Sequence, residues 1–267
     1  MGCAPLSGPI TITQVKRWAT GLLEIFFSSR NPIILSFTSN LQLRQSLTYT
    51  WIFIWGLRSF PELCYSLLPA YCILSNSALL PKVDKLEWLL VVVMLFIIYN
   101  LYTLTEYFEC GLLTRSWWNN QRAWRIYSST AWLFGVIRIV LKLLGLSETV
   151  FEVTKKGEPD AYDGPTDKIS GRFTFDESPI FIPATALVMV NLVAIALGFF
   201  RIIWAGINGQ VLLNVEYGAG ELGCCIWMLL MFSPFVRGLF GKGKYGIPTV
   251  TILKSMVLAL GLLSFVL

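Results

Sequence analysis

Residues 180–204, IFIPATALVMVNLVAIALGFFRIIW, form a long apolar stretch whose only charged side chain is Arg201. A transmembrane helix needs about 20 consecutive, mostly apolar residues to cross the hydrocarbon core of a bilayer, and this stretch is long enough. The composition agrees, because 55% of the 267 residues are hydrophobic and only 14% are charged, with a mean hydropathy of +0.64. Soluble domains carry roughly 25% charged residues. The sequence therefore predicts an all-α protein with several membrane spans.

Four further apolar stretches bring the predicted number of spans to about five. The five ranges are 49–74, 87–109, 180–204, 212–236 and 249–267. Another apolar stretch, Trp117 to Leu146, contains four cations, and burying these in hydrocarbon would cost several kcal/mol. We expect it to be an amphipathic helix lying in the membrane interface, and we expect the same of the basic segment 1–48.

The distribution of Lys and Arg predicts the orientation of the chain. If both interfacial segments lie on one side, the basic segments 1–48, 110–179 and 237–248 fall together, and such loops are normally cytosolic. The C-terminus is then lumenal. Residues 147–179 contain GEPDAYDGPTD (157–167), which has little to bury and is expected to be a mobile loop. The predicted units are 1–48, 49–109, 110–146, 147–179 and 180–267.

A first candidate site is QVKRWATG, residues 14–21. On a helix, Gln14, Arg17 and Trp18 share one face, and Gly21 leaves open space one turn further on. A Trp plane suits the apolar face of a sugar, and Arg can hold a phosphate with two parallel hydrogen bonds. The alternative is an interfacial helix whose Arg extends to the surface and whose Trp lies at headgroup level. This motif alone leaves both interpretations open.

A second candidate is FEVTKK, residues 151–156, at the start of the predicted loop. By itself it is also consistent with an ordinary loop segment that has a basic end. The chain contains no His, and its six Cys residues lack the spacing of a zinc site, so no metal ligand set is predicted.

These two motifs resemble those of the processive, membrane-embedded family 2 glycosyltransferases of the cellulose synthase superfamily. QVKRW fits their QxxRW motif, and FEVTKK fits their FxVTxK gating-loop motif. The chain is most similar to the plant cellulose-synthase-like H subfamily, from Gly2 to about Pro248. The segments that carry this likeness are GCAPLSGP, QVKRWATGLLEI, WWNNQRAWRI, LLGLSETVFEVTKK, FTFDESPIFIP and FVRGLFGKGKYGIP.

The resemblance implies roles for particular residues. Trp18 would stack under the terminal sugar of the growing glucan, and Gln14 and Arg17 would help to hold the acceptor and the nucleotide diphosphate. The gating loop would close over the UDP-sugar, through the residues Phe151, Val153, Thr154 and Lys156. The spans would form the tunnel through which the glucan, mixed-linkage or cellulose-like, leaves.

The resemblance also implies groups that these residues do not supply. Family members carry UDP-binding and metal-binding aspartates and the acidic base of a TED-type motif ahead of QxxRW. This sequence has no DxD, and its only Thr-Glu pair, Thr105–Glu106, falls in a predicted span. We therefore expect no catalytic residue and no metal ligand in this chain, with Mg or Mn bound only by a full-length enzyme. The polypeptide alone is expected to be inactive.

Two interpretations follow from these expectations. The chain is either the C-terminal translocation part of a β-glucan synthase that uses UDP-glucose, or a non-catalytic membrane protein that assembles with full-length synthases. The expected partners are the UDP-sugar, the β-glucan chain and the lipid bilayer, with other synthase subunits as a further candidate, and nucleic acid is not expected. The Golgi is the expected membrane, with the plasma membrane as the alternative.

Overall fold

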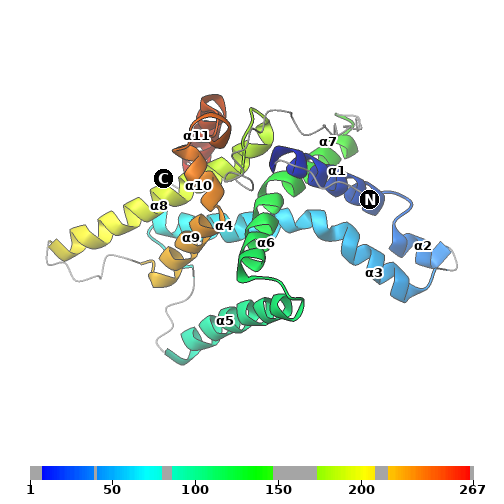
Figure 1. The fold of residues 1–267 in the computed structure, drawn as a ribbon, viewed down its shortest axis with the longest axis horizontal. Coiled ribbons are helices and arrows are strands. Elements are labelled where there is room, and N and C mark those ends of the chain that lie inside the picture. The colour runs from blue at the N-terminus through cyan, green and yellow to red at the C-terminus, as the bar shows by residue number, and fades with distance from the viewer. Residues whose placement is uncertain (1–7, 39–40, 80–85, 147–172, 208–215, 265–267) are drawn as a thin grey trace.

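The computed structural model describes residues 8–38, 41–79, 86–146, 173–207 and 216–264, and within these ranges all regular structure is helical (Figure 1). The predicted all-α class is confirmed. The α-helices are α1 (Gly8–Phe26), α2 (Pro32–Thr38), α3 (Leu43–Phe53), α4 (Ser59–Leu74), α5 (Leu86–Glu109), α6 (Thr114–Tyr127), α7 (Leu133–Leu143), α8 (Ile182–Ile207), α9 (Ala219–Met231), α10 (Ser233–Leu239) and α11 (Thr249–Ser264). Short 3-10 turns η1 (Ile54–Arg58), η4 (Pro179–Phe181) and η6 (Gly243–Tyr245) and a π turn, η2 (Ser128–Trp132), complete the described elements.

Helix α8 is the centre of one half of the molecule, where it packs against α4, α9 and α11. Its buried positions are mostly small or β-branched residues, which let the neighbouring helices approach closely. Two polar side chains on α8 also reach α4. Asn191 Nδ2 donates to the carbonyl oxygen of Ser66 at 2.9 Å, and Arg201 donates to the carbonyl oxygens of Ile73 and Leu74 at 2.6 and 3.0 Å.

Helix α1 packs across α7, the π turn η2 and the 3-10 turn η1. It buries Ile12, Val15, Ala19 and Leu23, which lie three or four residues apart, and leaves Trp18 58% exposed. Two glycines allow this close packing. A Cβ atom on Gly56 would lie 2.5 Å from Leu23 Cδ1, and one on Gly135 would lie 2.7 Å from Ala19 Cβ.

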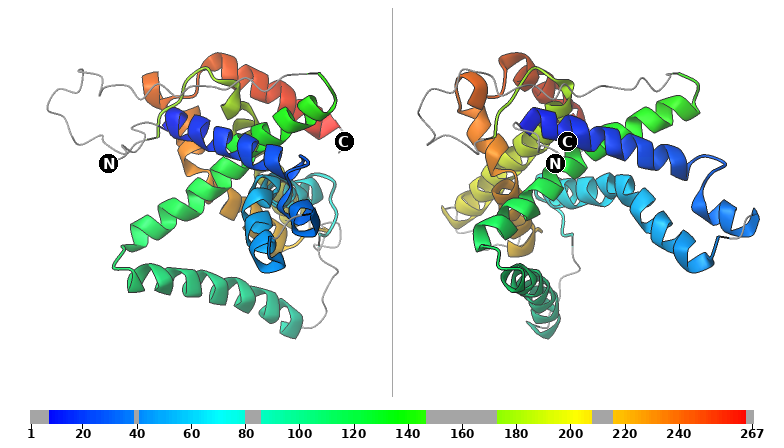
Figure 2. Two further views of the ribbon diagram at one scale, coloured as in Figure 1. Left: turned by 90° about the vertical axis from the view of Figure 1, so that its right-hand side faces the viewer. Right: turned by 45° about the vertical axis from the view of Figure 1, so that its right-hand side comes forward.

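Helix α5 lies at the edge of the described chain, as both views in Figure 2 show. It contacts α6, where Trp117 Nε1 donates a hydrogen bond to Thr103 Oγ1 at 3.0 Å. Phe96 also makes an edge-on ring contact with Trp227 of α9, with centroids 5.2 Å apart. The remaining described side chains of α5 are mostly exposed and apolar, a surface suited to lipid.

Three helices of the described ranges are long and apolar enough to cross a membrane: Thr114–Leu143, Pro179–Ile207 and Gly243–Ser264. Two of them overlap the predicted spans 180–204 and 249–267. The predicted span 212–236 is the bent pair α9 and α10, with an angle of 76° between them. The ranges 49–74 and 87–109 are helical but not among the three, so the predicted number of five spans is not confirmed.

The helix Thr114–Leu143 qualifies as a span by length and composition, although we predicted an interfacial helix there because of its four cations. The predicted cost of burying these cations assumed that none of them has a partner within the protein. In the structure Arg125 pairs with Glu62, Lys142 pairs with Glu24, and Arg122 bonds to Ser233. Paired cations cost much less to bury than isolated ones. The interfacial position of this helix and of α1 therefore stays a prediction.

Candidate functional site: an aromatic groove

An open groove of about 730 Å³ lies between α1 and α6. We call it the tryptophan groove, because four Trp side chains line it. Its described lining consists of Val15, Arg17, Trp18, Gly21, Leu22, Ile52, Trp55, Asn120, Trp124, Tyr127 and Trp132. The volume falls in the range of about 300–1,000 Å³ that small-molecule sites occupy. Aromatic walls with a few polar groups are typical of sites that bind the apolar face of a sugar.

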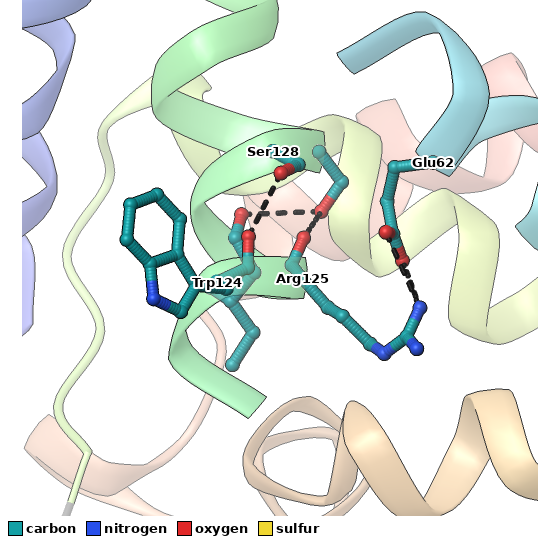
Figure 3. A network of polar contacts seen from close by, with 6 residues as sticks. Glu62, Trp124, Arg125 and Ser128 are labelled. Atoms are coloured by element: carbon teal, nitrogen blue, oxygen red, sulfur yellow. Dashed lines mark hydrogen bonds and ion pairs between the residues drawn. The ribbon is translucent and has the colours of Figure 1, made fainter. Parts of the chain in front are cut away.

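Helix α6 supplies Asn120, Trp124 and Tyr127, which are spaced four and three residues apart and so share one face. The next residue, Arg125, points in another direction and reaches α4 (Figure 3). Its Nη1 atom donates to Glu62 Oε1 and Oε2 at 3.1 and 3.3 Å. This ion pair holds α6 against α4 and thereby fixes the position of the groove face of α6.

Arg58 and Glu62 lie four residues apart, a spacing at which opposite charges on a helix can pair. Glu62 instead pairs with Arg125, and Arg58 lies over the ring of Trp124 at 5.1 Å. Trp124 also makes an edge-on contact with Trp55, with ring centroids 5.6 Å apart. A Trp held between a cation and a second ring is pre-oriented, so a ligand need not order it.

Trp132 lies at the end of the π turn and is only 3% exposed, yet it contributes to the groove wall. Its indole Nε1 is buried and has no hydrogen-bond partner. The hydroxyls of Ser128, Ser129 and Thr130 accompany the turn and donate to backbone carbonyls of the preceding helical turn; Figure 3 shows the bond from Ser128 to Trp124. The side chains of η2 are all buried, so the turn is a fixed part of the core.

The structure brings together part of the predicted QxxRW site. Arg17, Trp18 and Gly21 line the groove together, and nothing lies within 4 Å of the Cβ position of Gly21, as the sequence predicted. Gln14 is on the same helix but is not among the lining residues. The gating-loop residues Phe151, Val153, Thr154 and Lys156 lie outside the described residues.

The sequence interpretation missed the opposite wall of the groove, which is made by Trp55, Asn120, Trp124, Tyr127 and Trp132. A signal was available for three of these residues, since Asn120, Trp124 and Tyr127 have helical spacing. The segment WWNNQRAWRI was used only as a mark of family likeness. Nothing in the sequence indicated that its aromatic face would meet that of α1.

A cluster of metal-binding side chains is not found in the described part of the chain. None of its groups of His, Cys, Asp or Glu could hold a metal ion, and no carboxylate lines the groove. The divalent metal that the family likeness implies therefore does not fit these residues. The chemistry of the described groove is that of binding: stacking surfaces, one guanidinium and one amide.

Fold and site together define a helical protein that has helices long and apolar enough to cross a membrane and a groove lined by aromatic side chains. The family description "Cellulose synthase" matches residues 1–267, and the chain belongs to that family. It is 48% identical over 262 residues to the putative cellulose synthase-like protein H3 of Oryza sativa subsp. japonica, covering 97% of this chain and 32% of the relative. It is 44% identical over 270 residues to the cellulose synthase-like protein B4 of Arabidopsis thaliana, covering 97% and 34%. The chain thus spans about a third of these relatives.

Proposed function

We propose that this chain is the membrane-embedded translocation part of a processive β-glucan synthase, and that the tryptophan groove binds the end of the glucan that accepts the next sugar. The observation that carries the proposal is the meeting of Arg17 and Trp18 with the aromatic face of α6 in one groove. Flat rings match the C–H faces of β-linked glucose units, and the amide of Asn120 can bond to their hydroxyls.

The groove and the FxVTxK motif have different roles in this proposal. Trp18 stacks under the terminal sugar, and Arg17 lies beside it, where a guanidinium can bond to a phosphate oxygen of the nucleotide. Thr154 and Lys156 contact the diphosphate of UDP-glucose, and Phe151 and Val153 seat the loop. The described part of the groove contains no carboxylate, so it positions the acceptor and does not supply the base that removes its proton.

The proposed topology puts the basic segments 1–48, 110–179 and 237–248 in the cytosol and the C-terminus in the lumen of the Golgi. The glucan would then enter at the tryptophan groove on the cytosolic side and leave between the spanning helices. The likeness to the H subfamily favours a mixed-linkage glucan as the product. Labelling of introduced cysteines with an impermeant reagent in sealed vesicles would test this orientation.

Binding of cellohexaose to the purified chain tests the proposal directly. Because four Trp side chains line the groove, the sugar should change the intrinsic Trp fluorescence. Trp18→Ala should weaken the affinity by about tenfold, which corresponds to about 1.4 kcal/mol. Trp204→Ala is the matched control, since Trp204 is also 58% exposed but lies on α8, and it should leave the affinity unchanged.

Two results would contradict the acceptor role. Cellohexaose binding that is unaffected by Trp18→Ala would remove Trp18 from the site. Equal affinity for maltohexaose, an α-linked glucan of the same length, would show that the groove does not select β-linked chains. In a complete synthase, Trp18→Ala should also reduce incorporation of glucose from UDP-glucose into polymer without reducing membrane insertion.

A further inference from the structure

Three arginines gather where α6 meets the junction of α9 and α10. Arg122 Nη1 donates to Ser233 Oγ at 3.0 Å, which joins the two elements. Arg115 precedes Arg122 by seven residues on α6, and Arg237 follows Ser233 by four residues on α10. Residues with these spacings share a helix face, so both arginines lie on the faces that this bond brings together. The charges of Arg115 and Arg237 both act on Arg122.

The described residues do not neutralise this cluster, which we call the arginine triad. Within the described ranges, no carboxylate lies within ion-pair distance of Arg115, Arg122 or Arg237. The next arginine on α6, Arg125, differs from the triad because it forms an ion pair with Glu62. The charges of Arg115 and Arg237 are unfavourable beside Arg122, and an anion bound among these guanidinium groups would relieve the repulsion.

Arg122 uses its hydrogen-bonding groups inside the protein, whereas Arg115 and Arg237 are exposed to a ligand. Arg122 is half-buried; besides Ser233 it donates from Nη2 to Asn119 Oδ1 at 2.5 Å, and its Nε is buried without a partner. Arg115 and Arg237 are exposed. A ligand could therefore bond to the two exposed guanidinium groups while Arg122 stays fixed behind them.

The position of the triad indicates the kind of anion. It lies beside the 76° bend between α9 and α10, which together have the composition of a broken span. The chain after α10 adds two more exposed cations, Lys242 and Lys244. Basic pockets between spanning helices at the cytosolic face commonly bind the phosphate groups of lipid headgroups.

We propose that Arg115, Arg122 and Arg237, with Ser233, form a binding site for a phosphate group, carried by an anionic phospholipid of the surrounding membrane. Such a lipid would hold α6 against the α9–α10 junction. The same chemistry could also bind a soluble diphosphate, and the experiment below distinguishes the two sources. The site is separate from the tryptophan groove, because Arg122 lies two residues from both Asn120 and Trp124 and so faces another direction. It does not depend on glucan binding.

The test measures binding of dioctanoyl phosphatidic acid to the detergent-purified full chain by native mass spectrometry or calorimetry. Dioctanoyl phosphatidylcholine, which has no net charge, is the lipid control, and inorganic pyrophosphate is the soluble arm. Arg115→Gln and Arg237→Gln should each weaken binding of phosphatidic acid by about fivefold, the effect expected for one basic residue near a lipid phosphate, and the double variant by about 25-fold. Both side chains are exposed and lack a carboxylate partner in the described structure, so both variants should fold.

Arg44→Gln is the matched control, since Arg44 is an exposed arginine on α3. It should leave binding of phosphatidic acid unchanged. Binding of phosphatidic acid that is lost in the triad variants, with no displacement by pyrophosphate, supports the lipid site. Displacement by pyrophosphate with the same dependence on the triad supports a phosphate site filled from solution. Equal binding by the wild type and the triad variants, or an equal loss in Arg44→Gln, overturns the proposal.

Discussion

Replacement of Gly135 by Ala should separate α1 from α7 and so disturb the tryptophan groove. The added Cβ would lie 2.7 Å from Ala19 Cβ and 3.3 Å from the backbone nitrogen of Thr20. Carbon atoms in contact normally lie about 3.5–4.0 Å apart, so α1 must move by roughly 1 Å. Helix α1 carries Arg17 and Trp18, and its movement would shift both relative to α6.

The expected change in the free energy of unfolding combines two opposing effects. Overpacking a close contact costs about 1–3 kcal/mol, whereas replacing a helical Gly with Ala gains up to about 1 kcal/mol. Gly135→Ala should therefore lower the free energy of unfolding by about 0–3 kcal/mol. Gly223→Ala is the matched control, because Gly223 also lies in a helix but nothing lies within 4 Å of its Cβ position. It should raise stability by up to about 1 kcal/mol.

The double variant Gly135→Ala with Ala19→Gly removes the closest contact and should recover most of the loss. The assays are denaturant unfolding of the purified chain and cellohexaose affinity from Trp fluorescence. Gly135→Ala should weaken both, and the double variant should restore the affinity. If Gly135→Ala is as stable as Gly223→Ala, or if Ala19→Gly brings no recovery, the close approach of α1 and α7 does not position the groove.

Two further substitutions test how α4 is held by its neighbours. Glu62→Gln leaves Arg125 without its carboxylate and should lower the free energy of unfolding by about 1–3 kcal/mol, less than for a fully buried pair because the two side chains are 14% and 24% exposed. Adding Arg125→Gln to Glu62→Gln should recover part of this loss, and an additive loss would contradict the pairing. Arg201→Gln removes two charged hydrogen bonds to the end of α4 and should cost about 1.5–3 kcal/mol for each bond lost, seen as faster hydrogen exchange at residues 71–76. The exposed Lys254 of α11 provides the control Lys254→Gln, which should not change exchange there.

The helices were predictable from the sequence because their information is local. The apolar ranges 180–204 and 249–267 reappear as α8 and α11, and the amphipathic spacing around QVKRW reappears as α1. The ion pairs made by residues 114–143 were not predictable, because they join residues that are far apart in the sequence. Glu62 and Glu24 lie 63 and 118 residues away from the cations that they pair with, and no local pattern connects them.

The groove also shows where prediction from sequence fails, in this case within a single helix. In a regular α-helix of 3.6 residues per turn, Trp132 would lie about 80° around the axis from Trp124. In the π turn at Ser128–Trp132, the backbone hydrogen bonds join residues five positions apart instead of four. The turn therefore accommodates about one extra residue, and this rotates Trp132 back around the helix axis by about 100°. Trp132 then comes within roughly 20° of Trp124, on the face shared with Asn120 and Tyr127. A helical periodicity applied to the sequence would place Trp132 outside the groove, and only the irregular turn brings its indole into the wall. Since π turns are frequent at functional sites, this irregularity is consistent with a binding role for the groove.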